Sequence, residues 1–277
     1  MKKYDIRLIC LDLDGTLLNS DKQLSERNRR ALAECAARGI YIVPTTGRLA
    51  GALTPSVAAL PFLRYVIAVN GALIEDLKTG EVLCREEIPN ADALRILSVL
   101  DSFPGIYDCY IDGCGYMNAE MLEKARDYTI DSHHLALVQS TRKPVADLQA
   151  FVRDKGCTVQ KSQIMFHSRE IRDEALPKIR ALLPDFLHSC TYATNIEINS
   201  PRAHKGAGLQ FLCRHLGIPI ANTMSFGDGS NDISMLQAAG VGVVMANADA
   251  DILPYGDITA PSCDEDGVAQ ILERYVL

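Results

Sequence analysis

The sequence of 277 residues has no tryptophan and no run that approaches the about 20 consecutive apolar residues of a membrane helix. It also has no excess of positive charge, since 28 lysines and arginines stand against 35 aspartates and glutamates for a formal net charge of -7. The basic footprint of a nucleic-acid-binding protein is therefore missing. These absences exclude a membrane-spanning helix and argue against nucleic acid or membrane as a partner.

Cysteine is present but lacks any pairing pattern. Nine cysteines are scattered along the chain without a Cys-x-x-Cys pair. An odd number without close pairs fits neither a disulfide framework nor a zinc site. The first apolar run is broken by Asp12 and Asp14 before the hydrophobic region of a signal peptide could form. We therefore expect reduced, mostly buried thiols in a cytoplasmic protein.

Several nucleotide and calcium motifs are missing as well. No Gly-x-x-x-x-Gly-Lys occurs, which excludes a phosphate loop of the nucleoside-triphosphate type. Gly240 and Gly242 lack the third glycine of a dinucleotide fingerprint and follow an expected helix, which disfavours a nicotinamide cofactor. An EF-hand that began at Asp228 would need glycine at Ile233 and glutamate at Ala239, so it is excluded too.

The most informative stretch is an apolar run from Leu8 that ends in two acids, Asp12 and Asp14, followed by Gly15. Such a run is typical of a buried strand in a parallel sheet, and ligands of open α/β sheets bind where strands end. Two neighbouring acids repel each other unless a cation or proton lies between them, and Mg²⁺ is the hard cation that suits oxygen ligands. The alternative is a plain Asp-Gly hairpin turn.

Three later segments repeat this pattern of a strand followed by polar residues. The second expected strand leads into Thr45–Arg48, whose hydroxyls and amides predict an anion-binding concavity or an ordinary helix cap. A strand from Asn195 leads to a helix near Lys205, where a lysine opposes the helix dipole and indicates a bound anion, unless it is merely solvated. The next strand ends in the glycines and carboxylates of Gly227–Asp232.

The order of these segments predicts the fold class. Strands alternate with helices in βαβ order, which indicates an α/β protein with a doubly wound parallel sheet whose strand ends share one edge. Residues 85–190 carry no sharp motif and predict an inserted α+β cap domain, with 1–84 and 191–277 forming the core. Histidines in that segment lack paired acids at metal spacing and are expected to be structural; they are His133, His134, His167 and His188.

Together, the strand ends carry the groups of a phosphoryl-transfer site. An acid pair with Mg²⁺, one cation and one hydroxyl suit this chemistry, because its catalysis consists mostly of positioning and charge neutralisation. A carboxylate can act as the nucleophile, which gives an aspartyl phosphate that water then cleaves.

The motifs resemble those of a known family, the haloacid-dehalogenase-like hydrolases. The four motifs of that family correspond in order to Asp12–Thr16, Thr46–Arg48, Lys205-Gly206 and Gly227–Asp232. The sequence is most similar to the Cof-type sugar-phosphatase-like branch with a type IIB cap, for which Asn70–Ala72, Asn231–Leu236, Met245–Ala248 and Asp266–Val268 are also characteristic. Ala246 departs from the glycine that is frequent there, which we expect to affect only a loop.

The resemblance implies a role for each residue of the site. Asp12 attacks phosphorus, while Asp14 protonates the leaving oxygen and later activates the hydrolytic water. The ligands of Mg²⁺ would be the Asp12 carboxylate, the Asp14 main-chain carbonyl and Asp228, with Asp232 supporting from nearby. The groups that bind the phosphoryl oxygens would be Thr46, the amides of Leu13 and Gly47, Lys205 and Asn231.

The implied function is Mg²⁺-dependent hydrolysis of a small phosphate monoester, such as a sugar phosphate, with Asp12, Asp14, Thr46 and Lys205 as the catalytic set. Arg48 either reaches the substrate or braces its loop. Two alternatives stay open, namely a phosphohexomutase on the same fold and a catalytically idle sensor of a phosphate ligand. The sequence predicts neither the exact substrate nor the oligomeric state.

Overall fold

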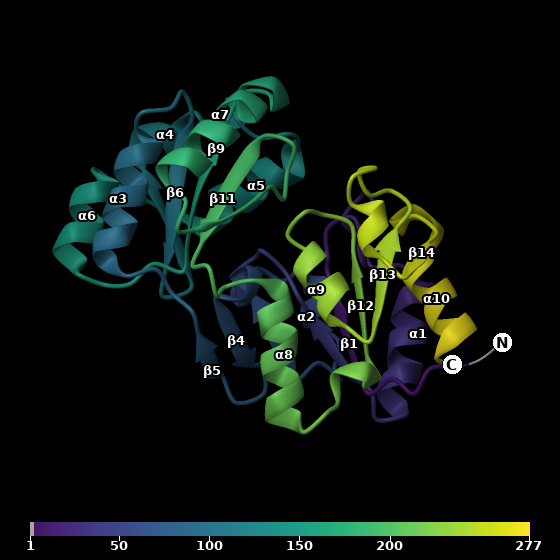
Figure 1. Ribbon diagram of the computed structural model, residues 1–277. Helices are drawn as coiled ribbons and strands as arrows, with labels where there is room; N and C mark the ends of the chain where they lie inside the picture. The colour runs from purple at the N-terminus through teal and green to yellow at the C-terminus, as the bar shows by residue number, and fades with distance from the viewer. Residues whose placement is uncertain (1–2) are drawn as a thin grey trace. The chain divides into compact units, whose positions relative to one another are not determined.

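The structure, a computed structural model, describes residues 3–277. These residues divide into two compact units (Figure 1). The first unit comprises the chain up to Cys84 together with His204–Leu277, and the second is the continuous segment Arg85–Ala203.

The second boundary differs from the one expected from the sequence. The chain leaves the first unit after Cys84, at the expected place, but returns to it after Ala203 rather than after Cys190. The reason is β11 (Asn195–Asn199), which pairs antiparallel with β9 (Lys161–Met165) inside the second unit. A strand that the sequence analysis assigned to the core therefore belongs to the inserted segment.

The first unit is built on a five-stranded sheet in the order β14-β13-β12-β1-β2, and all of its pairings are parallel. The predicted doubly wound parallel sheet is thereby confirmed. Its strands are β1 (Leu8–Leu11), β2 (Tyr41–Pro44), β12 (Thr223–Gly227), β13 (Val241–Met245) and β14 (Ile258–Ala260). The helices of this unit are α1 (Glu26–Ala37), α2 (Pro55–Ala58), α8 (Lys205–Leu216), α9 (Ile233–Ala238) and α10 (Gly267–Tyr275).

Helices cover both faces of this sheet (Figure 1). Because successive side chains of a strand point to opposite faces, β1 contributes to two separate cores. Ile9 and Leu11 pack into the core that includes α1 and α10. Leu8 and Cys10 pack into the core that includes α8 and α9. All four side chains are fully buried, so β1 is fixed from both sides and the position of its carboxyl end is fixed with it.

A smaller three-stranded sheet follows β2 along the chain. It consists of β3 (Tyr65–Ala68), β4 (Leu73–Asp76) and β5 (Glu81–Arg85) in that order. An isolated parallel bridge between Thr45 and Ile67 joins β3 to the end of β2. The loop after β2 is therefore held between the two sheets.

The second unit has its own six-stranded sheet, in the order β10-β11-β9-β6-β7-β8 and antiparallel except for the pair β7–β8. Its remaining strands are β6 (Ile106–Ile111), β7 (Cys114–Asn118), β8 (Arg142–Val145) and β10 (Leu187–Ser189). Its helices are α3 (Asn90–Leu100), α4 (Ala119–Glu123), α5 (Ser132–Thr141), α6 (Leu148–Lys155) and α7 (Arg169–Leu182). The expected α+β insertion is thus present as a separate sheet with helices.

The two faces of this second sheet differ in polarity. Residues of α3, α6 and α7 pack on an apolar face that includes Cys109 and Ile164. The opposite face carries buried ion pairs, Arg142 with Asp108 at 2.9 Å and Lys161 with Glu197 at 2.6 Å. Two of the histidines of this unit stack on tyrosine rings, in the pairs His134–Tyr192 and His167–Tyr128.

Hydrogen bonds tie the two ends of the chain together within the first unit. The backbone N–H of Tyr4 donates to the carbonyl of Tyr275 at 2.9 Å. The buried Asn28 of α1 donates to the Leu17 carbonyl at 3.3 Å and accepts from the Ala269 N–H at 2.9 Å. Asn28 therefore joins the segment after β1 to α10.

Residues 3–277 bear on two expectations from the sequence, which concern membrane-spanning helices and the state of the cysteines. No helix in this range is long and apolar enough to cross a membrane. None of the nine cysteines, all of which lie in this range, forms a disulfide, and five of them are buried.

Candidate active site

The first acidic motif lies at the carboxyl end of β1, where the backbone N–H of Asp12 donates to the Phe226 carbonyl of the neighbouring β12 at 3.0 Å. The chain then turns through Gly15, whose φ of +87° favours glycine. A Cβ added at Gly15 would overlap the Asp228 carboxylate. The Thr16 hydroxyl donates to Oδ1 of Asp228 at 2.8 Å. Glycine thus lets the loops after β1 and β12 approach each other closely.

Lys205 occupies the centre of this region. Its Nζ donates to Oδ1 of Asp12 and to Oδ1 of Asp232, both at 2.6 Å, and the side chain is fully buried. Lys205 is the first residue of α8, which is capped by His204 through a bond from the Ala207 N–H to Nδ1. The anion expected beside this lysine is supplied by two carboxylates of the protein itself.

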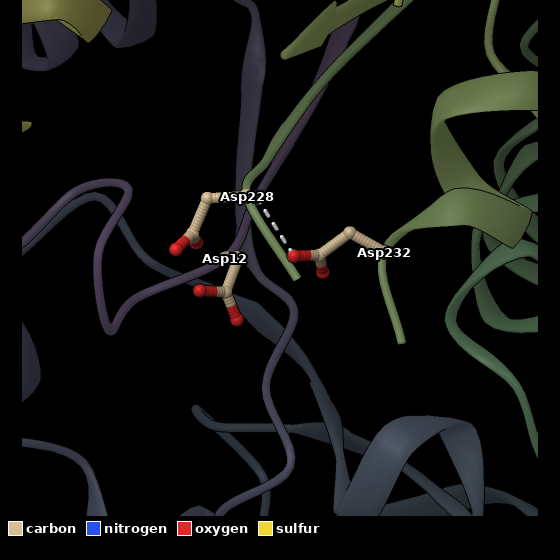
Figure 2. Close-up of side chains that lie close together, drawn as sticks. All are labelled: Asp12, Asp228 and Asp232. Carbon is tan, nitrogen blue, oxygen red and sulfur yellow. Dashed lines mark hydrogen bonds between the residues drawn. The ribbon is translucent and has the colours of Figure 1, made fainter. Parts of the chain in front are cut away.

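Asp232 links the loop after β12 to this lysine. While Oδ1 accepts from Lys205, Oδ2 accepts from the backbone N–H groups of Asp228 and Gly229 at 3.0 and 2.9 Å. Figure 2 shows Asp232 reaching from the start of α9 toward the backbone at Asp228. Asp232 therefore fixes the loop that carries Asp228.

Asp12, Asp228 and Asp232 form a cluster of carboxylates (Figure 2). One oxygen of each lies within 4.8 Å of the others, and no other group of this kind occurs among residues 3–277. Burial raises the pKa of Asp12 well above its usual range despite Lys205, and burial together with Asp232 raises the pKa of Asp228 to about 7.

This cluster fits a divalent cation. Three carboxylates face one buried ammonium, so the ionised cluster keeps an excess of two negative charges in a setting with little solvent. Its donors are all oxygen atoms, which suits Mg²⁺ or another hard ion. Burial is the first cause of the raised pKa values of Asp12 and Asp228, and the neighbouring carboxylates add to it, because a bound proton relieves part of the excess negative charge.

Asp14 stands apart from the cluster, with cations of its own. Arg48 donates from Nε and Nη2 to the two Asp14 oxygens, both at 2.7 Å, and Nζ of Lys22 lies 3.1 Å from Oδ1. Burial alone would raise the pKa of Asp14, but its hydrogen bonds and charge interactions with Arg48, followed by those with Lys22, lower it. Two roles were left open for Arg48, and the structure shows it in contact with the loop that carries Asp14.

The remaining predicted residues lie in the loops around this point. Leu13 and Gly47 are buried in the loops that follow the adjacent strands β1 and β2. The hydroxyl of the buried Thr46 accepts from the Arg48 N–H at 3.1 Å in an ST-turn, and it does not cap the next helical turn, Ala50–Ala52, whose N-cap residue is Leu49. The Asn231 amide donates to Oδ1 of Asn70 at 3.1 Å, so its contact in the structure is with a neighbouring loop.

Three residues near the site were given no role by the sequence. Thr16 belongs to the first motif, which was the available signal, and its hydroxyl donates to Asp228. Asn247 belongs to a segment characteristic of the resembled branch, and it donates to the Gly15 carbonyl at 2.8 Å and accepts from the Cys263 N–H at 2.9 Å. Lys22 has no such signal, because its contact with Asp14 depends on the conformation of a turn.

Comparisons with known proteins agree with this geometry. A family model described as haloacid dehalogenase-like hydrolase matches residues 9–272. Phosphatase YwpJ of Bacillus subtilis (strain 168) is 32% identical over 286 residues, which cover 97% of this chain and 99% of the relative.

Solved structures extend the likeness to the fold. A haloacid dehalogenase-like hydrolase from B. subtilis matches with a TM-score of 0.85 at 32% identity, covering 98% of this chain and 100% of that one. The haloacid-dehalogenase subclass IIB sugar phosphatase BT4131 matches with a TM-score of 0.78 at 25% identity, covering 97% and 98% of the two chains.

The match covers nearly the whole chain, insertion included, and the four motifs meet where the strands of the parallel sheet end. The chain therefore belongs to the haloacid-dehalogenase-like hydrolases and is a phosphatase of their Cof-type branch.

Proposed function

We propose that the protein hydrolyses small phosphate monoesters, sugar phosphates or similar metabolites, with Mg²⁺ and through an aspartyl phosphate on Asp12. The observation that carries the proposal is the buried contact of Lys205 with Asp12 inside a cluster of carboxylates. A related solved structure named as a sugar phosphatase supports the substrate class.

Asp12 is the proposed nucleophile. Its place at the end of a buried strand leaves the carboxylate little freedom, and Lys205 favours its ionised form against the effect of burial. The phosphoryl oxygens would be held by Lys205, Thr46, Asn231 and the amides of Leu13 and Gly47. These donors replace water around a group whose charge is redistributed during transfer.

The proposed Mg²⁺ would be held by the Asp12 carboxylate, the Asp14 main-chain carbonyl and Asp228, and it would neutralise charge on the phosphoryl group. Asp232 supports this arrangement indirectly, because it binds the amides of the loop that carries Asp228. Thr16 orients the Asp228 carboxylate through its hydroxyl.

Asp14 is the proposed general acid and base. When the bond between phosphorus and the leaving oxygen breaks, Asp14 gives that oxygen a proton. When water attacks the aspartyl phosphate, Asp14 takes a proton from it, so the residue returns to its starting state. Its separation from the carboxylate cluster supports this role, because its side chain is not committed to the metal.

We further propose that the second unit chooses the leaving group. This proposal is supported by the location of the proposed catalytic residues, since every residue assigned above to phosphoryl transfer lies in the first unit. The sheet of the second unit carries buried charged side chains of both signs, which suit a polar leaving group.

The first prediction concerns Asp12. Asp12→Asn should bring phosphate release to background while circular dichroism and the melting temperature stay near those of the wild type, because the substitution conserves size. The exposed Asp21→Asn serves as a control that should keep full activity. Near-normal turnover in the folded Asp12 variant would refute the nucleophile. Release of an isomeric sugar phosphate by the wild type would indicate a mutase, and no turnover would indicate a binding protein.

The second prediction concerns the metal. A chelator should abolish activity, added Mg²⁺ should restore it, and excess Ca²⁺ should inhibit. Ca²⁺ is larger and accepts more flexible coordination, so it would misplace the Asp12 carboxylate relative to phosphorus. Steady-state phosphate release measures all three effects, and full activity in the chelator would rule out the metal requirement.

The third prediction concerns the second unit. Exchange of Arg85–Ala203 for the corresponding segment of a relative with a different substrate should transfer that relative's substrate profile. A screen of phosphorylated metabolites for phosphate release gives both profiles. The division of labour is wrong if the profile of the chimaera follows the first unit instead.

The fourth prediction concerns Asp14. General acid-base catalysis is typically worth about 10²–10⁴-fold, so Asp14→Asn should lose at least that much with a sugar phosphate, whose leaving oxygen is strongly basic. With nitrophenyl phosphate the first step should survive better, while hydrolysis of the aspartyl phosphate becomes slow. Rapid mixing should then show a burst near one nitrophenol per enzyme, and mass spectrometry should find phosphate on Asp12. An equal loss for both substrates without a burst would contradict the role.

A further inference from the structure

We propose that Asn70 is a positioning residue that orients the side-chain amide of Asn231 toward the phosphoryl group. Asn70 acts through Asn231 rather than by a contact of its own with the substrate. The inference rests on the proposed function, because Asn231 is one of the residues assigned there to the phosphoryl oxygens. Asn70 lies in the first unit, in the short loop Val69–Gly71 between β3 and β4.

The first observation is the hydrogen bond between the two side-chain amides. Nδ2 of Asn231 donates to Oδ1 of Asn70 at 3.1 Å, and Asn70 is only 2% exposed. A side-chain amide carries two N–H bonds in one plane. When one of them is bound to Asn70, the plane of the Asn231 amide and the direction of its second N–H are both set. Asn231 is thereby oriented before a phosphoryl oxygen arrives.

The backbone of the loop is the second observation. Val69 and Asn70 have φ values of +51° and +59°, so two successive residues with a Cβ lie in the left-handed region. Asparagine tolerates this region, but valine is β-branched and seldom adopts it. Backbone strain of this kind persists only where the surrounding structure imposes it, and it is concentrated at functional sites.

The loop after β2 is the first neighbour that holds this backbone in place. The Val69 N–H donates to the Arg48 carbonyl at 2.9 Å, and the Asn70 N–H donates to the Thr46 carbonyl at 3.0 Å. Both acceptors belong to the second motif, so the strained residues are bonded directly to a loop of the site. The backbone position of Asn70 is therefore tied to that of Thr46.

The start of α8 also contacts the loop Val69–Gly71. A Cβ added at Gly71 would lie 2.6 Å from the carbonyl oxygen of His204, the N-cap residue of α8. The loop thus contacts the second and third motifs through its backbone, and it reaches the fourth through the Asn70 side chain. Asn70 has a position that is fixed independently of Asn231, as a residue that orients another must have.

These observations together explain why asparagine stands at position 70. Glycine would adopt the left-handed backbone with less strain, but it has no side chain that could accept a hydrogen bond. Aspartate tolerates the same backbone, but it would add negative charge near a site that binds a phosphoryl group. Asparagine combines a tolerated backbone with a neutral acceptor, which is what the Asn231 amide requires.

The test is a double-mutant cycle on Asn70 and Asn231 in the full chain with saturating Mg²⁺. Asn70→Gly removes the acceptor and suits the left-handed backbone, while Asn231→Ala removes the amide that Asn70 orients. Asn70→Ala removes the same acceptor with a Cβ retained, so the result does not depend on the folding of one variant. Asp112→Gly is the matched control, because Asp112 has a φ of +50° in an exposed turn of the second unit. Melting temperatures show that each variant is folded.

The measured quantities are kcat/KM for nitrophenyl phosphate and the inhibition constant of inorganic phosphate. Asn70→Gly should lower kcat/KM and raise the inhibition constant by about three- to tenfold, the effect of one lost hydrogen bond. The double variant Asn70→Gly/Asn231→Ala should match Asn231→Ala within about twofold, because Asn70 then has no amide to orient. Asp112→Gly should match the wild type.

Two results would overturn the inference. If the losses of the two single variants multiply in the double variant, Asn70 acts independently of Asn231, either by shaping the loop or by contacting the substrate. If Asn231→Ala weakens phosphate binding and Asn70→Gly does not, the contact between the two amides has no part in binding.

The same cycle separates this failure from that of the proposed function. If Asn231→Ala changes neither quantity, the assignment of Asn231 to the phosphoryl oxygens falls, and the role of Asn70 falls with it. If Asn231→Ala causes a loss that multiplies with that of Asn70→Gly, only the role of Asn70 falls. The nucleophile is tested independently by Asp12→Asn.

Discussion

The interaction on which the rest of the site depends is the buried ammonium of Lys205 between Asp12 and Asp232. A fully buried charge is tolerated only when it is paired and hydrogen-bonded. Here the ammonium is paired with two carboxylates that are themselves held in place. The contact joins the end of β1, the start of α8 and the residue that precedes α9, which are far apart in the sequence. Because each segment is held by its own apolar face, Lys205 connects positions that packing has already fixed.

The structure also separates two acids that the sequence places one residue apart. Asp12 contacts Lys205 and lies close to two further carboxylates, and burial raises the pKa of Asp12. Asp14 is surrounded by Arg48 and Lys22, which lower its pKa against the effect of burial. Asp12 directly follows the last residue of β1, whereas Asp14 lies in the turn beyond it, and the two side chains lie in different settings. Two identical residues thereby acquire different chemistry from their neighbours alone.

The residues of this site that lie at strand ends could be predicted from the sequence, whereas side-chain contacts between segments far apart in the sequence could not. Parallel strands bring their carboxyl ends to one edge, so the apolar runs that stop at Asp12 and Asp228 were enough to place these two residues together. Lys205 was expected beside them because of a preceding strand, Asn195–Asn199, which lies in the other sheet. The segment Asn195–Asn199 reads equally well as a strand of either sheet, and only its pairing with β9 assigns it to the insertion. The partners of Arg48 and Lys22 depend on loop conformation, in particular on a left-handed lysine that no propensity favours.

The place of β1 inside its sheet has a consequence for the growing chain on the ribosome. β1 lies between β2 and β12, yet β12 is translated only after the entire continuous segment Arg85–Ala203. Until then one edge of the strand that ends at Asp12 has no neighbour, and the Asn28 side chain lacks its hydrogen bond from the Ala269 N–H. The inserted unit, by contrast, has all of its strands as soon as it has been made. Translation thus delivers a complete second unit before a complete first one, and the cluster of Asp12, Asp228 and Asp232 is among the last features of the molecule to assemble.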